Sequence, residues 1–104
     1  MLRWCCAFVV TAVALTATAY ADTFQLLHKS GQATYRVANA RIVVFDSEDD
    51  ARFEGYTDRQ GRVLLTLPNG IYTARVVYRQ ATWCVTMRVT GDREVRDLML
   101  ASCR

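Results

Sequence analysis

Residues 58–72 have the sequence DRQGRVLLTLPNGIY, which indicates one β-strand between two turns. Val63, Leu65 and Leu67 alternate with other residues along it, and a period of two predicts a strand with one buried face. The letters DRQG before the strand and PNG after it are turn signals. Aspartate bonds its own backbone, glycine accepts positive φ, and proline ends a ladder of hydrogen bonds. The stretch therefore predicts antiparallel β-structure.

The same pattern continues along the chain outward from this stretch. Turn signals recur about every 8–12 residues, a spacing that is typical of β-sandwiches and barrels. One face of each segment is apolar and the other is mixed, which favours antiparallel sheets covered on one side. Seven strands are predicted, at residues 24–29, 40–46, 53–57, 63–67, 71–79 and 83–89, with a last one ending at residue 100.

The N-terminus resembles a targeting segment. Arg3 precedes an apolar run at residues 7–19, and Ala19-Tyr20-Ala21 fits the small-x-small cleavage rule for secretory signals. A membrane anchor needs about 20 apolar residues, and this run is shorter and is followed by Asp22. We therefore expect a cleavable signal peptide at residues 1–21 and one domain at residues 22–104, with no membrane span in the mature chain.

Four cysteines are present, and cleavage would remove Cys5 and Cys6. Export into an oxidising compartment predicts a disulfide between Cys84 and Cys103. A tight hairpin at residues 91–92 would place Cys84 about 13 Å from Cys103, too far for a disulfide. Two paths remain open, a wider loop over residues 93–97 or a C-terminus that turns back, and we expect the wider loop.

Charge excludes one class of partner. The 13 basic and 10 acidic residues give a net charge of +3, and removing Arg3 with the signal lowers it to +2. Nucleic-acid recognition requires a dense basic stripe, which an exported chain of such small charge does not provide. We expect a periplasmic or secreted protein of bacterial origin.

Three segments carry a family resemblance: VANARIVV at residues 37–44, YTDRQGRV at residues 56–63, and LTLPNGIY at residues 65–72. They resemble the GAxVxV strand, TDxxGxF hairpin and LPxGxY turn of carboxypeptidase regulatory-like domains, which are transthyretin-like (prealbumin-like) β-sandwiches. The resemblance implies a seven-stranded antiparallel Greek-key β-sandwich. This sequence departs from the family pattern at Asn39, where the family usually has glycine. Asparagine is tolerated there because it also adopts the left-handed backbone conformation.

The resemblance implies an accessory, binding or structural module without peptidase activity, since the regulatory-like domain lacks the catalytic part. Hydrolases of the transthyretin-like fold use several histidines and a C-terminal Tyr-Arg-Gly-Ser, whereas this chain has only His28. Related domains with isopeptide bonds join a lysine to an asparagine or aspartate beside a buried acid. Lys29 and Asp97 are conceivable reactants here, but only Glu54 on another strand could replace that acid, so this reading is disfavoured.

An acidic cluster follows the second predicted strand and contains Asp46, Glu48, Asp49 and Asp50. Oxygen-rich loops bind calcium, but the spacing lacks the glycine and the distal glutamate of an EF-hand. A solvated loop is the preferred interpretation. No metal or other cofactor is expected.

A mixed basic and apolar face is the best candidate site. Arginine and aromatic residues are enriched at protein interfaces, although arginine stems also cover ordinary sheet faces. The candidate residues are Arg75, Arg79, Arg88, Val43, Phe45 and Val77. The leading hypothesis is an exported, non-enzymatic module that binds another envelope or secreted protein. The alternative is a carrier of a small ligand or carbohydrate, and a homo-oligomer is left open.

Overall fold

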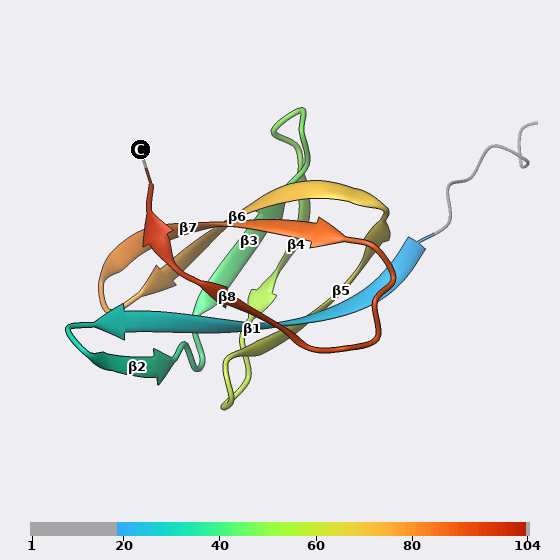
Figure 1. Ribbon diagram of the computed structural model, residues 1–104. Coiled ribbons are helices and arrows are strands. Elements are labelled where there is room, and N and C mark those ends of the chain that lie inside the picture. The colour runs from blue at the N-terminus through green and yellow to red at the C-terminus, as the bar shows by residue number, and fades with distance from the viewer. Residues whose placement is uncertain (1–18, 104) are drawn as a thin grey trace, which may run out of the picture.

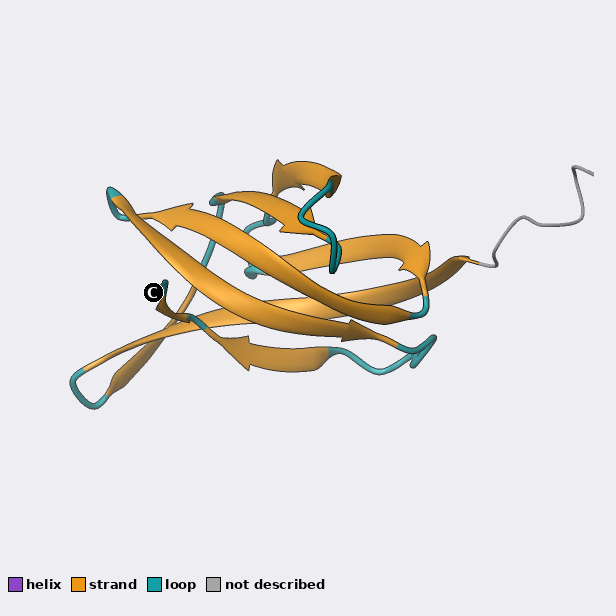
Figure 2. Cartoon of the chain, turned by 90° about the horizontal axis from the view of Figure 1, so that it is seen from above, coloured by secondary structure: helices purple, strands orange, loops and turns teal. Residues whose placement is uncertain are grey.

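The computed structural model describes residues 19–103, and these residues form two layers of β-strands without a helix (Figure 1). The strands are β1 (Ala19–Ser30), β2 (Ala33–Arg36), β3 (Arg41–Phe45), β4 (Ala51–Tyr56), β5 (Arg62–Pro68), β6 (Gly70–Tyr78), β7 (Ala81–Val89), β8 (Arg96–Met99) and β9 (Ala101–Ser102). Figure 2 shows the long twisted strands from above, joined by short loops.

The first sheet is built around β1, and the second has the order β4-β3-β6-β7-β9. In the first sheet β1 pairs antiparallel with β5 and then with β2, and it pairs parallel with β8. All pairs of the second sheet are antiparallel. The fold is therefore an all-β arrangement of two sheets, antiparallel except for the β1–β8 pair.

The core lies between the sheets and follows the alternation in the sequence. Strand β5 alternates exposed and buried residues along its whole length, and β6 and β7 do so over most of theirs. Burial of the apolar face is the main favourable term in the folding of such a domain. The fully or nearly fully buried residues include Phe24, Leu26, Ile42, Leu65 and Met87.

The turn from residue 57 to residue 61 joins the two sheets. The Asp58 carboxylate accepts hydrogen bonds from the N–H groups of Gln60 at 2.8 Å and Arg62 at 2.9 Å. Gly61 has a φ of 79°, and an added Cβ there would lie 2.9 Å from the carbonyl oxygen of Leu26. Glycine is required at this position by both its conformation and the close approach of β1.

Most predicted strands and their buried faces are confirmed, but the strand count differs. Residues 19–103 form nine strands rather than the seven predicted, because the short β2 and β9 carry no apolar alternation that could reveal them. Asn39 has a φ of 54°, so the left-handed conformation expected at this departure from the family pattern is present.

The path of the C-terminus corrects one expectation. Instead of a wide hairpin beside β7, residues 90–95 cross to the other sheet, where β8 pairs with β1. The chain then turns back, and β9 pairs with β7 so that Cys84 lies opposite Ala101. This is the alternative path, and it forms the predicted Cys84–Cys103 disulfide with a Cα–Cα distance of 5.0 Å.

The predicted signal peptide lies almost entirely outside the described residues. The predicted cleavage position after Ala21 falls within β1, whose residues Ala19 to Ala21 pair with Thr66 to Pro68 of β5. Within residues 19–103 no helix is long and apolar enough to span a membrane.

Candidate interaction surface

The predicted interaction residues lie on neighbouring strands of the second sheet, with one exception. The register places Val43 beside Arg75, and Phe45 beside Thr73, on the face that points away from the core. Val77 and Arg88 lie on the same face of β6 and β7, because residues two apart in a strand share a face. We call Val43, Phe45, Arg75, Val77 and Arg88 the outer face.

Arginine and aromatic groups are already arranged on this face. The guanidinium of Arg75 lies over the ring of Phe45, 5.5 Å from its centroid, which is a cation–π contact. Val77 is 45% exposed beside it. Neither Arg75 nor Arg88 forms an ion pair with any acid among residues 19–103. The face therefore combines accessible apolar area with two unpaired cations.

Tyr56 and Ile71 extend the apolar part of this face, and sequence reasoning did not include them. Tyr56 lies on the edge strand β4, opposite Arg41 of β3, and is 69% exposed. Ile71 of β6 lies opposite Arg88 of β7 and is 51% exposed. Arg41 itself is neutralised by an ion pair with Glu54, which raises the pKa of the Arg41 guanidinium. The alternation of side chains along each strand could have assigned Tyr56 and Ile71 to the outer face from the sequence.

Arg79 does not belong to the outer face, contrary to the prediction. It lies in the turn between β6 and β7 with a φ of 54°, which breaks the alternation of β6. Its guanidinium lies 5.1 Å from the ring centroid of Tyr35 and 5.3 Å from that of Tyr78. Arg79 therefore joins the two sheets at one end of the sandwich.

His28 lies at this same end and packs against aromatic rings. Its ring centroid is 4.8 Å from that of Trp83 and 5.5 Å from that of Tyr78, both in edge-on geometry. Trp83 packs against the core, and its indole N–H donates to the carbonyl oxygen of Tyr78 at 3.2 Å. His28 is thus a half-buried strand residue whose ring packs against other rings.

The Lys29–Asp97 pair considered for an isopeptide bond is not assembled. Asp97 lies beside Gln25 in the β1–β8 register, four residues before Lys29, which corresponds to about 13 Å along a strand. Both side chains are exposed, and Glu54 lies in the other sheet in its ion pair with Arg41. The structure therefore excludes this pairing.

The acidic loop after β3 is organised by its own backbone. The Asp46 carboxylate accepts hydrogen bonds from the N–H groups of Glu48 at 2.8 Å and Asp50 at 3.0 Å, and from Arg52 at 2.7 Å. The hydrogen bond from the Asp50 backbone, followed by the one from Arg52, holds the pKa of Asp46 below its usual value. Carboxylates of Asp46, Glu48 and Asp50 approach within 4.8 Å of one another. Arg52 forms an ion pair with one of these carboxylates, that of Asp46.

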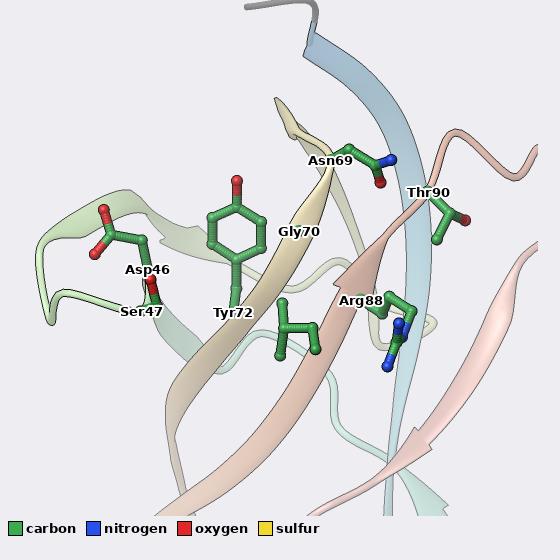
Figure 3. Close-up of a pocket in the computed structure, with 8 residues that line it drawn as sticks. Asp46, Ser47, Asn69, Gly70, Tyr72, Arg88 and Thr90 are labelled. Atoms are coloured by element: carbon green, nitrogen blue, oxygen red, sulfur yellow. The ribbon is translucent and has the colours of Figure 1, made fainter.

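An open depression of about 580 Å³ lies between the acidic loop and the start of β6. Figure 3 shows its side chains arriving from the loop after β3, the turn before β6, β6 itself, and the end of β7. The Tyr72 hydroxyl donates to the carbonyl oxygen of Pro68 at 2.7 Å, which fixes the turn at one wall. The remaining polar groups are Asp46, Ser47, Asn69, Arg88 and Thr90.

A buried charge pair was not predicted from the sequence. Asp22 is fully buried and forms an ion pair with Arg96, and it accepts hydrogen bonds from the N–H groups of Thr90 and Gly91. The Arg96 guanidinium also lies 4.7 Å from the ring centroid of Phe24. The only sequence signal is an acid in the first predicted mature position, and the partner is 74 residues away.

Comparison with known proteins supports the fold and no particular activity. No protein-family model and no curated protein sequence matches this chain. Among solved structures, it is similar to S.CueP (TM-score 0.55, 17% identity over 82% of this chain) and to the Bacillus anthracis TIE protein (TM-score 0.54, 16% identity over 79%). It is also similar to a DUF3823 family protein from Parabacteroides merdae (TM-score 0.53, 10% identity over 81%).

These similarities cover only parts of the other proteins. The chain spans 65% of S.CueP, 47% of the Parabacteroides protein and 17% of the TIE protein. At such low identity the likeness concerns the arrangement of strands alone. It shows that this two-sheet fold also occurs within larger chains.

Proposed function

We propose that this protein is an exported, non-enzymatic β-sandwich module, whose outer face binds an acidic surface on another envelope or secreted protein. The observation that carries the proposal is the arrangement of Arg75 over Phe45, beside exposed Val77 and beside Arg88, which forms no ion pair within the described part of the chain. Arginine and aromatic residues are enriched at protein interfaces, where a few residues carry most of the binding energy.

The electrostatics of the face specify the kind of partner. Among residues 19–103, Arg75 and Arg88 form no ion pair, whereas the nearby Arg41 and Arg52 are neutralised by Glu54 and Asp46. Carboxylates of a partner would supply the missing ion pairs and would gain strength as water is excluded. Because Arg75 is held by the ring of Phe45, less side-chain entropy is lost on binding.

Export and family membership are part of the same proposal. The signal-like N-terminus and the disulfide support an oxidising compartment. The left-handed Asn39, the glycine turn at Gly61 and the Tyr72–Pro68 hydrogen bond support membership of the carboxypeptidase regulatory-like sandwiches. Each of these features serves a turn or a core position and implies no catalytic step.

The test is crosslinking in living cells of the native host, with a tag placed after Arg104. The double variant Arg75→Glu/Arg88→Glu reverses the charge of the outer face. The double variant Arg59→Glu/Arg93→Glu is the matched control, because it makes the same charge change on exposed residues of turns elsewhere. Arg79→Glu tests the end of the sandwich separately.

The proposal expects one exported protein to be captured by the wild type and by the control, and lost from the outer-face variant while that variant stays folded. The captured protein should carry an acidic patch, and raising the salt concentration should weaken the complex. Capture that survives Arg75→Glu/Arg88→Glu, or that depends on Arg79 instead, would contradict the assignment of the face.

A second candidate function, a carrier of a small polar ligand, is favoured by the depression shown in Figure 3. Its walls offer hydroxyl, amide, carboxylate and guanidinium groups, which match a sugar or a small hydroxy acid. Calorimetric titration with a panel of such compounds tests this function. Asn69→Ala should weaken binding of a ligand held there, whereas Arg75→Glu should not, since Arg75 does not line the depression.

A further inference from the structure

Strand β5 forms the outer border of the first sheet, and its free edge is long and apolar. Its sequence from residue 62 to residue 68 is RVLLTLP, and it pairs only with β1 among the described strands. Unpaired strand edges template further strands, and proteins protect them with charges, bulges or coverage. Here the only charge is Arg62, at the first position.

The hydrogen bonds of the preceding turn show which backbone groups face this edge. The N–H and C=O of Arg62 both bond to Asp58, at 2.9 and 3.0 Å, on the side away from β1. In a strand, alternate residues direct both backbone groups to the same side. The N–H and C=O groups of Leu64 and Thr66 therefore point to the free edge, whereas those of Leu65 point to β1.

The side chains next to these groups are suited to a partner strand. Leu64 is 56% exposed and Thr66 is exposed, both on the outward face of the sheet, and neither carries a charge. The edge strand of the other sheet is different. Strand β4 carries Arg52 and Glu54, both in ion pairs, and its register with β3 shifts between Val44 and Phe45. Such charges and irregularities disfavour strand addition at β4.

We propose that β5 is a docking edge, and that its partner is β5 of a second copy of this chain. Antiparallel pairing centred on Leu65 sets Leu64 opposite Thr66 of the second copy and Thr66 opposite its Leu64. Each of these pairs exchanges two hydrogen bonds, so that all four free groups of the two residues are satisfied in each copy. The first sheets of the two copies then form one continuous sheet.

The charge pattern favours a second copy as the occupant. In this register Arg62 of each copy lies beyond the apolar centre, opposite the Pro68 end of the other strand. The two arginines are then about 20 Å apart, farther than the Debye length of about 8 Å at physiological ionic strength. The contact is isologous, so that it closes after two copies and does not extend into a filament. The outer face of the other sheet stays free.

The experiment is sedimentation equilibrium over a wide concentration range, on protein expressed from the full-length reading frame and purified after export. The wild type should show a reversible equilibrium between monomer and dimer. Leu64→Lys should weaken the dimer at least tenfold, because the two lysines would be diagonal neighbours on one face, two positions apart in the register near its centre. Ile71→Lys is the matched control, since Ile71 is a similarly exposed apolar residue on the other sheet, and it should leave the dimer unchanged.

Thr66→Pro removes one edge-facing N–H group and leaves the bonds to β1 intact, so it should give a folded monomer. Hydrogen exchange on the wild type tests the register without any variant. Protection of the Leu64 and Thr66 amides should rise with protein concentration, while that of the Leu65 amide should stay constant.

Three results would overturn the proposal. The first is a wild type that stays monomeric at every protein concentration. The second is a dimer that persists in both Leu64→Lys and Thr66→Pro. The third is hydrogen exchange of the Leu64 and Thr66 amides that does not depend on protein concentration. A strand of another protein found on β5 would also overturn the choice of a second copy. None of these results bears on the outer face, which Arg75→Glu/Arg88→Glu tests independently.

Discussion

The carboxylate of Asp22 and the guanidinium of Arg96 form an ion pair that ties β1 to the start of β8. Asp22 is fully buried, and it also accepts hydrogen bonds from the N–H groups of Thr90 at 3.1 Å and Gly91 at 2.9 Å. One side chain therefore fixes the loop over residues 90–95, through which the chain changes sheets. Tyr20 covers the same loop, since an added Cβ at Gly91 would lie 2.8 Å from its ring.

Asp22→Ala should lower the free energy of unfolding by about 3 kcal/mol, because it leaves Arg96 and two N–H groups without their acceptor. The value lies at the low end for broken buried pairs, since Arg96 is 27% exposed. Urea unfolding of the wild type, Asp22→Ala, Arg96→Met and the double variant gives a double-mutant cycle for the free energy of unfolding. The double variant should lose less than the sum of the two single variants. Additive losses would show that Asp22 and Arg96 act separately.

The Cys84–Cys103 disulfide holds β9 against β7 across a sequence separation of 19 residues. Replacing both cysteines by serine should lower the free energy of unfolding by about 3 kcal/mol in the chain-entropy model. The comparison is urea unfolding of oxidised wild type against the double variant. Reduced wild type should match the double variant, and an unchanged midpoint in both would contradict a stabilising role.

Thr57 is a buried hydroxyl that joins β4 to the segment before β3. Its oxygen accepts from the N–H of Ala40 at 2.9 Å, and its O–H donates to the carbonyl oxygen of Val37 at 2.6 Å. Thr57→Val keeps the shape but leaves both backbone groups unsatisfied, and should cost about 1–3 kcal/mol of stability. Thr86→Val, at an exposed position of β7, is the control and should cost less than about 0.5 kcal/mol.

Acid should destabilise the fold partly through Asp58. Hydrogen bonds from the backbone of Arg62, and then of Gln60, hold the pKa of Asp58 below its ordinary value of 3.8. A group with a lowered folded-state pKa stabilises the fold above its unfolded pKa, and this contribution is lost as the pH falls through the folded value. The melting temperature should therefore decrease when the pH is lowered below about 4.

The matched variant is Asp58→Asn, which keeps an oxygen acceptor but does not titrate. Its thermal midpoint should fall less between pH 7 and the acid range than that of the wild type. An identical acid dependence of wild type and variant would show that Asp58 does not contribute, and Asp46, which also has a lowered pKa, would be the next residue to replace.

Much of the outer face could be predicted because it depends only on local alternation. Val43, Phe45, Arg75, Val77 and Arg88 lie where their parity in the strands placed them. Arg79 could not be assigned in this way, because two residues with positive φ, Arg79 and Gln80, form the turn and redirect the side chain. The neighbourhood of Arg79 and Tyr35 depends on how the two sheets pack.

The class of fold, the buried face of most strands and the two main turns could be read from the order of the residues. These follow from period-two alternation and from aspartate, glycine and proline at turns, and all are interactions between residues close in the chain. Three features depend on how distant segments pack: β8 joins β1 in parallel, β9 returns to β7, and Asp22 binds Arg96. Strand partners are selected by packing and backbone pairing between distant segments, which the period of a single strand does not encode.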